Sequence, residues 1–169
     1  MNIVLIGYRG TGKSTVGRIL ASRYSLEYIS MDETIVERTG LSIPQIVEQS
    51  GWDHFRDLES QLADELSRQD GFLIDTGGGV IERENNIEAL KADAVIVWLR
   101  ADVDTIISRI ASSTERPALT AGNSFTDEVS EVLARRTPMY EAAANICVST
   151  DGRTPEEIVD LIIEAGNEL

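Results

Sequence analysis

The sequence predicts an α/β fold in which a parallel sheet is covered by helices on both faces. Short apolar segments alternate along the chain with longer segments of helical periodicity, and a glycine-rich motif joins the first apolar segment to the first helical one. Alternation of this kind is typical of strand–helix–strand units, whose consecutive strands run parallel. The length of 169 residues is that of one domain, so residues 1–169 are expected to share one core.

Each predicted element follows from a local pattern. The first strand is the apolar run IVLI at residues 3–6, and apolar residues recur at helical spacing after the glycine-rich motif. The predicted strands are residues 2–6, 27–30, 71–75, 94–99 and 145–149. The predicted helices are residues 13–24, 32–39, 43–69, 82–90, 102–111, 124–144 and 154–166. Pro44 suits the first turn of its helix, whereas Pro138 is expected to kink or break the helix around it.

Residues 7–14 read GYRGTGKS, the complete phosphate-binding pattern G-x-x-x-x-G-K-S. Glycines let backbone N–H groups wrap around a phosphate, and the helix that starts there adds positive partial charge. Lys13 can reach the β- and γ-phosphates, and the Ser14 hydroxyl can bind Mg²⁺, which prefers oxygen ligands. The motif predicts a site for ATP and Mg²⁺ built from Gly10, Thr11, Gly12, Lys13, Ser14 and Thr15. The motif leaves the phosphoryl acceptor open: water, a small molecule or a protein.

Composition excludes several classes of partner. The formal net charge is −14, which argues against nucleic-acid binding because phosphates need a basic surface. No apolar run is long enough to cross a membrane, and the first residues lead into a strand rather than a signal peptide. The single cysteine, Cys147, fits a reducing cytoplasm and is expected to be buried in the last strand. We therefore expect a cytoplasmic, monomeric protein with no membrane or nucleic-acid partner.

Charged residues at the strand ends suggest a small acidic acceptor. Asp32 follows the second strand, and ligands of parallel sheets bind at this edge. Arg56 lies on a predicted helix with Glu59 three residues on, close enough to hold it. Arg136 ends a helical stretch. Guanidinium groups form paired bonds to carboxylates and phosphates, although a single arginine is more often a surface residue.

Two further segments could complete the site. The polar stretch 112–123 contains Arg116 and has the length of an active-site lid, the alternative being an ordinary surface loop. Gly77-Gly78-Gly79 follows the third strand closely, and three glycines in a row there forfeit strand stability. The three glycines therefore indicate that an acceptor approaches the backbone closely, the alternative being a flexible turn.

In combination, these motifs resemble the shikimate kinase family over essentially the whole chain. The resemblance rests on residues 7–14, Met31-Asp32, 37–40, Phe55-Arg56, Glu59, 76–79, 116–119 and 136–140. It implies a three-layer P-loop fold like that of nucleoside monophosphate kinases, with a five-stranded parallel sheet. It also implies a substrate-binding region at about residues 32–62 and a lid at about 112–123. The implied activity is Mg-ATP-dependent phosphorylation of the 3-hydroxyl of shikimate, in aromatic amino-acid biosynthesis.

The resemblance also implies roles for single residues on the acceptor side. Asp32 would hold the hydroxyls of shikimate and take part in proton removal. Arg56 and Arg136 would hold the carboxylate of shikimate. The backbone of residues 77–79 would line its ring.

On the nucleotide side, Arg116 would close on the phosphates together with Lys13, offsetting the charge on the transferring group. Arg109 matches a family residue that packs on adenine, and Arg153 falls in the region of the adenine loop. Closure of the lid would exclude water and limit ATP hydrolysis.

One position departs from the pattern of the family. Family members usually have Asp-x-Asp at the end of the second strand, whereas this chain reads Ser30-Met31-Asp32. The first aspartate normally supports Mg²⁺, and serine is a weaker, neutral ligand. The third strand ends in Asp75, where most members hold a small residue. We hypothesise that Asp75 supplies the missing carboxylate and holds Mg²⁺ through water, the alternative being that it caps the turn into Gly77.

Two alternative functions stay open at this point. The same fold could serve a related small-molecule kinase, such as one acting on gluconate or a nucleotide. The serine at position 30 also fits a catalytically impaired paralogue that only binds nucleotide.

Overall fold

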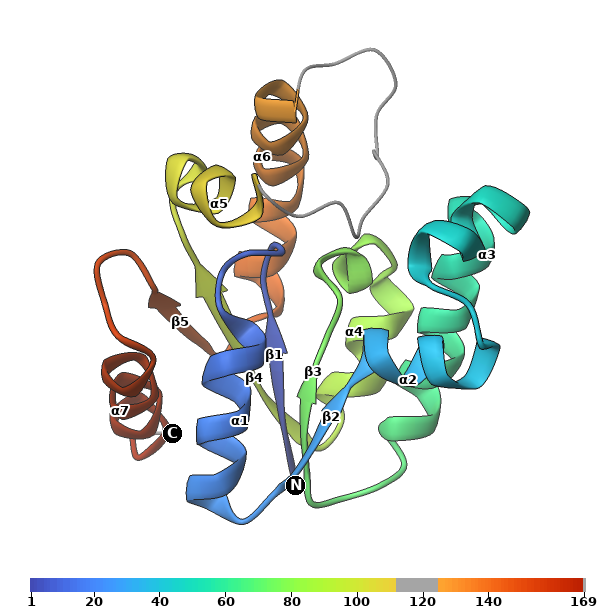
Figure 1. Ribbon diagram of the computed structural model, residues 1–169. Coiled ribbons are helices and arrows are strands. Elements are labelled where there is room, and N and C mark those ends of the chain that lie inside the picture. Colours follow the sequence, from blue (N-terminus) through green and yellow to red (C-terminus); the bar gives the residue numbers. More distant parts are fainter. Residues whose placement is uncertain (112–124, 169) are drawn as a thin grey trace.

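Five parallel strands form the central sheet of the computed structural model, which describes residues 1–111 and 125–168 (Figure 1). The strands are β1 (Asn2–Ile6), β2 (Glu27–Ser30), β3 (Phe72–Asp75), β4 (Ala94–Arg100) and β5 (Ile146–Ser149). Their order across the sheet is β2-β3-β1-β4-β5, and every neighbouring pair is parallel. The carboxyl ends of the strands therefore meet at one edge, where ligands of such sheets bind.

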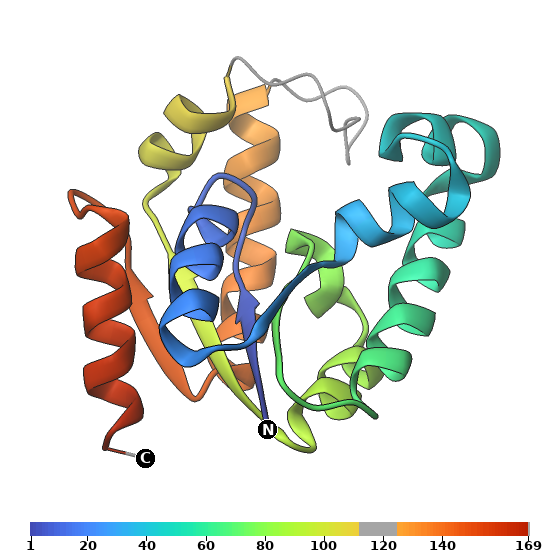
Figure 2. The same cartoon turned by 60° about the horizontal axis from the view of Figure 1, so that its bottom comes forward.

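Helices cover both faces of the sheet, which confirms the predicted three-layer fold. They are α1 (Lys13–Tyr24), α2 (Met31–Thr39), α3 (Ile43–Leu66), α4 (Glu84–Lys91), α5 (Val103–Ile110), α6 (Phe125–Ala143) and α7 (Pro155–Gly166). Helices α1 and α7 lie side by side on one face, and α4 and α6 lie on the other (Figures 1 and 2). At the carboxyl edge, α2 and the first part of α3 lie on one side and α5 on the other.

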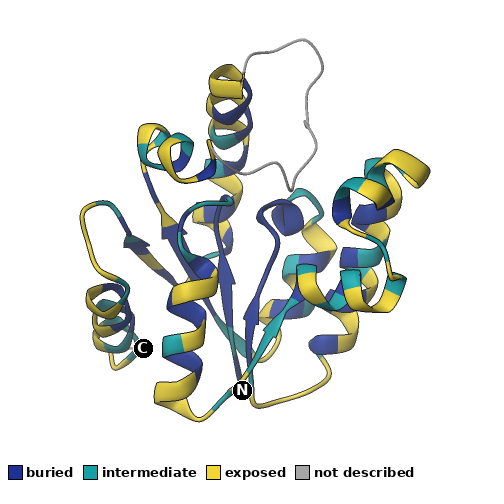
Figure 3. Cartoon of the chain, in the orientation of Figure 1, coloured by how far each residue is buried: buried dark blue, intermediate teal, exposed yellow. Residues whose placement is uncertain are grey.

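The period-two alternation of the strands divides the core between these layers. Leu5 and Leu73 pack with α1 and α7, whereas Val4, Ile6 and Ile74 pack with α3, α4 and α6. All five side chains are buried, and the central strands form the buried centre of the molecule (Figure 3). The sheet is thus covered on both faces, as the continuous apolar runs in the sequence indicate.

Most predicted bounds agree with the structure within two residues. The main difference is a short 3-10 helix, η1 (Gly78–Glu82), where the sequence predicted no helix before residue 82. Helix α3 also bends at Gly51, whose φ of 84° interrupts the helical backbone. Pro44 lies in the first turn of α3, as expected, behind a capping box formed by Ser42 and Gln45.

Of the kink or break predicted at Pro138, the break was wrong, because helix α6 continues to Ala143. The Thr137 hydroxyl donates to the Leu133 carbonyl within the affected turn. The predicted burial of the cysteine was also wrong. Cys147 is exposed rather than buried. It lies on the edge strand β5, where alternation buries Ile146 and turns the next side chain outward.

The predicted lid, 112–123, falls outside the described residues, as does Arg116. Among the described helices, none combines the length and the apolar composition that crossing a membrane requires.

Candidate active site

The glycine-rich motif lies at the carboxyl end of β1 and turns directly into α1. Gly12 is the N-cap of α1, with a φ of 93° that glycine adopts without strain. The Lys13 ammonium donates to the carbonyls of Gly7 (2.8 Å) and Tyr8 (3.0 Å), so it lies against the loop. The Thr11 hydroxyl donates to the same Tyr8 carbonyl at 2.8 Å. A helix N-terminus and an ammonium group thus meet in one loop, which is an arrangement that binds phosphate.

A cavity of about 450 Å³ adjoins this loop at the carboxyl edge of the sheet. Its lining comes from the loop, the ends of β2 and β3, and α5. The lining residues are Arg9, Gly10, Gly12, Lys13, Ser14, Thr15, Ser30, Asp32, Glu33, Asp75, Thr76, Gly77, Gly78, Arg109 and Ile110. The volume falls within the range of small-molecule sites. The cavity therefore places the phosphate-binding loop beside Asp32 and the first two glycines of the triplet.

A buried carboxylate is hydrogen-bonded to the end of the phosphate-binding loop. Asp75 is 6% exposed, and its Oδ2 accepts hydrogen bonds from the Ser14 hydroxyl (2.8 Å) and the Tyr28 hydroxyl (2.6 Å). Burial, and then the bond to Asp75, raise the pKa of Tyr28 well above its usual range, so the phenol stays protonated and donates. In the described structure Asp75 is thus tied to α1 and β2 rather than to the backbone of the turn at Gly77.

Ser30 serves the start of a helix. It is the N-cap of α2, and its side chain accepts from the Glu33 N–H at 3.3 Å. Asp32, in the first turn of α2, lines the cavity. The two side chains reach the same cavity, but only Asp32 carries charge.

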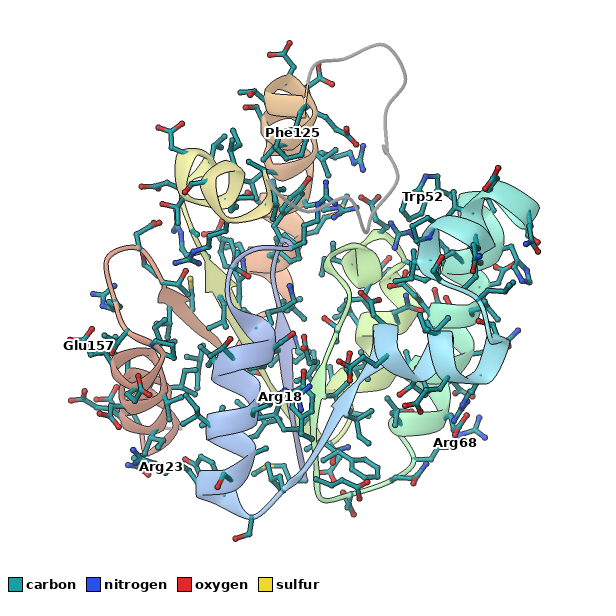
Figure 4. The ribbon with its side chains drawn as sticks, in the orientation of Figure 1. Arg18, Arg23, Trp52, Arg68, Phe125 and Glu157 are labelled. Atoms are coloured by element: carbon teal, nitrogen blue, oxygen red, sulfur yellow. The ribbon has the colours of Figure 1, made fainter. Side chains whose placement is uncertain are left out.

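Arg56 is held in place by a buried partner and by a glycine. Its Nη1 donates to Oε1 of Glu59 at 2.5 Å, and Glu59 is fully buried. The guanidinium lies against Gly79, where an added Cβ would be 2.2 Å from both Nη atoms. Its Cζ is 5.2 Å from the centre of the Trp52 ring, on the outer part of α3 (Figure 4). Gly79 is therefore required because the guanidinium occupies the space of a side chain.

Arg136 has an equivalent support on the other side of the glycine triplet. Its Nε donates to Oε1 of Glu82 at 2.7 Å, and Arg135 donates to the same oxygen at 2.6 Å. Arg136 is 3% exposed, and its Nη1 would lie 3.4 Å from a Cβ added to Gly78. The Tyr140 hydroxyl donates to the Gly78 carbonyl at 2.5 Å, and burial raises the pKa of Tyr140 to about 12. Helix α6 thus fixes both the arginine and the loop beside it.

A second cavity, of about 280 Å³, continues from the phosphate-binding loop toward α7. Arg109 and Arg153 both line it, together with Gly12 and Thr15 from the loop. The Arg109 Nη1 donates to the Gly10 carbonyl at 3.0 Å, which holds the guanidinium beside the loop. The position fits a group attached to the phosphates, as the base of a nucleotide is.

Comparison with known proteins agrees with this geometry. A family model described as shikimate kinase matches residues 9–166. The chain belongs to the shikimate kinase family. Members of this family are ATP-dependent kinases that phosphorylate a hydroxyl of shikimate. A shikimate kinase from Thermodesulfovibrio yellowstonii is 39% identical over 168 residues, covering 99% of this chain and 96% of that protein.

Solved structures of the family have the same fold. A shikimate kinase from Acinetobacter baumannii in complex with shikimate superposes with a TM-score of 0.93 at 31% identity, covering 99% of this chain and 93% of that one. The enzyme from Aquifex aeolicus gives a TM-score of 0.83 at 32% identity, covering 99% and 97% of the two chains. The predicted family, fold class and kinase activity are therefore confirmed.

The structure brings together most of the predicted site residues, although not in one cavity. Arg56, Gly79 and Arg136 adjoin the main cavity through their contacts and do not line it. Tyr28 and Glu82, which hold site residues in place through hydrogen bonds, were not predicted from the sequence. The sequence does indicate the orientation of Tyr28. It lies two residues before Ser30, the last residue of β2, and side chains two residues apart in a strand lie on the same face.

Proposed function

We propose that this chain transfers the γ-phosphoryl group of Mg-ATP to the 3-hydroxyl of shikimate, through the residues described above. The main support is a cavity lined by the phosphate-binding loop, Asp32, Gly77 and Gly78, with two arginines held just behind the glycine triplet. A donor site and an acceptor site in contact are what direct phosphoryl transfer requires.

On the donor side, the loop N–H groups and Lys13 would hold the phosphates. Arg109 and Arg153 would flank the adenine in the second cavity. We also propose that Arg116, which lies outside the described residues, acts on the phosphates. Together these cations would offset the charge that develops on the transferring group.

The residues present fit a magnesium ion bound along with the nucleotide. The Ser14 hydroxyl and the Asp75 carboxylate are hard oxygen donors that line the same cavity. Within the described residues no group of three or more acidic, histidine or cysteine side chains could hold a metal alone. Such a sparse set suits Mg²⁺, which usually takes one or two protein ligands and completes its shell with phosphates and water. The ion would supply charge neutralisation on the phosphates.

On the acceptor side, Arg56 and Arg136 would bind the shikimate carboxylate, each braced by a glutamate. Gly77, Gly78 and Gly79 would let the ring approach the backbone. Asp32 would hold the ring hydroxyls and accept the proton of the attacking one.

The decisive experiment is ADP production from Mg-ATP with and without shikimate, with gluconate and quinate as control acceptors. A large increase with shikimate alone is the expected result. No increase with any acceptor, from protein that still binds Mg-ATP, would overturn the proposal in favour of an impaired paralogue. An increase with gluconate alone would indicate a different acceptor.

We also propose, as expected from the sequence, that the chain acts as a monomer. Sedimentation at assay concentration tests this. The cytoplasmic location stays a prediction from the sequence.

A further inference from the structure

We propose that Asp75, at the end of β3, supplies the carboxylate that holds nucleotide-bound Mg²⁺ through water, and that Tyr28 positions this carboxylate. The inference rests on the proposed function and extends it, because it adds Tyr28 as a residue that positions Asp75 and shows that a carboxylate could be exchanged between Asp75 and its ladder partner Ser30. Four observations carry it: strand register, the hydrogen bonds of Asp75, the packing of Tyr28 and the separate role of Ser30.

The register of the sheet makes the exchange geometrically simple. Ser30 and Asp75 are direct partners across the parallel β2–β3 ladder. Neighbouring strands are about 4.8 Å apart, so a carboxylate attached to either position reaches the same region of the carboxyl edge. Both residues line the main cavity. A carboxylate absent from one strand end is therefore present on its immediate neighbour.

The hydrogen bonds of Asp75 leave it suited to a metal-bound water. The side chains of Ser14 and Tyr28, which donate to it, are neutral hydroxyls, and both hydrogen bonds converge on Oδ2. Within the described part of the chain, Oδ1 is thus left to accept a hydrogen bond from a water molecule bound to the Mg²⁺ ion. Neutral donors satisfy a buried carboxylate without cancelling its charge, which a cation can then neutralise. The Ser14 hydroxyl directs its proton to Asp75, so its lone pairs are available to Mg²⁺.

Tyr28 is built into the structure as a fixed donor. Its ring packs against the backbone of α1 at Gly17, where an added Cβ would be 3.0 Å from Cε2. The Arg18 guanidinium lies over the ring, with Cζ 4.3 Å from its centre, between α1 and β2 (Figure 4). The phenol is therefore restrained by its packing while its hydroxyl bonds to Asp75 at 2.6 Å. Tyr28 is thus a positioning residue, which acts through Asp75.

Ser30 has a different task that an aspartate could also perform. It caps α2 by accepting from the Glu33 N–H. Aspartate is as good an N-cap as serine, so Ser30→Asp keeps the helix start intact. The carboxylate can therefore be returned to β2 by mutation without removing the cap.

The test measures the metal contribution to nucleotide binding, which does not require turnover. The dissociation constant of ADP is measured by calorimetry in excess Mg²⁺ and in EDTA, and the ratio of the two is the metal benefit. Asp75→Ser should reduce this benefit at least tenfold and leave the EDTA value within twofold. Adding Ser30→Asp to Asp75→Ser should restore most of it. Asp75→Asn, which keeps the shape of the side chain, serves if the serine variant does not fold.

Tyr28→Phe tests the positioning role. It should reduce the metal benefit roughly three- to tenfold, the range of a typical single hydrogen bond, because the carboxylate itself stays in place and keeps the bond from Ser14. Tyr24→Phe is the matched control, because Tyr24 is 44% exposed at the far end of α1 and should change nothing. A structural defect would instead weaken ADP binding equally with and without Mg²⁺.

Clear results would overturn the inference. An unchanged metal benefit in Asp75→Ser or Asp75→Asn refutes the assignment of Asp75, and so does a double variant no better than the single one. Equal values for the two tyrosine variants refute the role of Tyr28. Failure of the proposed function gives a different pattern: no shikimate-dependent ADP production by the wild type, with the metal benefit still dependent on Asp75.

Discussion

Adding one methyl group at Gly79 should weaken shikimate binding by displacing the Arg56 guanidinium, which lies against this glycine. In Gly79→Ala, the new Cβ would lie 2.2 Å from both Nη atoms of Arg56, about 1.2 Å short of ordinary contact. The guanidinium must therefore move, which disturbs its 2.5 Å bond to Glu59 and its aim at the acceptor. A hydrogen bond to a charged group is worth about 1.5–3 kcal/mol, so we expect the shikimate dissociation constant to rise roughly 10- to 150-fold.

Calorimetric titration with shikimate measures this effect, and titration with ADP should change less than twofold. Gly166→Ala is the matched control, since the nearest atom to its added Cβ is the Tyr24 hydroxyl at 4.0 Å. If the effect passes through Arg56, then Gly79→Ala should add little in an Arg56→Ala background. A Gly79→Ala protein that binds shikimate like the wild type would refute the reasoning.

Three further predictions follow from the described contacts. Lys13→Met should lower kcat at least 100-fold in steady-state assays and leave the shikimate dissociation constant unchanged; a matching loss of shikimate binding would contradict it. Tyr140→Phe removes the buried bond to the Gly78 carbonyl and should lower the free energy of unfolding by about 1 kcal/mol in urea titrations, whereas an unchanged midpoint would argue against it. Burial alone would raise the pKa of Glu82, but the hydrogen bond from Arg136 and that from its neighbour outweigh it and lower the pKa below the ordinary 4.5. The stability that ionised Glu82 supplies is thus fully present above pH 4.5 and is lost as the pH falls through the lowered pKa. The difference in Tm between the wild type and Glu82→Gln should therefore shrink in acid. A difference that stays constant with pH would refute this.

Local patterns were enough to predict the strands and the phosphate-binding loop. The bounds of β1, β2 and α1 agree with the prediction because each combines an apolar run with a specific stop or start signal, such as the N-cap at Gly12. The pairing of Arg56 with Glu59 was also predicted, since spacing of three residues on a helix brings two side chains together.

Features that depend on tertiary contacts could not be predicted in this way. The 3-10 helix η1 forms where Gly78 is bound by Tyr140, a residue 62 positions further along the chain. The Tyr28–Asp75 bond likewise joins β2 to β3 across 47 positions; alternation along β2 gives the face on which Tyr28 lies but does not identify its partner. Exposure of Cys147 follows from the place of β5 at the edge of the sheet, which depends on strand order rather than on composition.

The ion pairs of the arginines in the proposed shikimate-binding region also determine which anions can bind there. Arg56 is paired with Glu59, while Arg135 and Arg136 share Glu82. These five side chains carry a net charge of one positive, and Asp32 adds a negative charge nearby, so the region falls far short of the positive charge that a triphosphate needs. The formal charge of −14 on the whole chain further repels polyanions. Free ATP should therefore compete poorly for the acceptor region. High nucleotide concentrations in a cell would then not prevent the acceptor substrate from binding there.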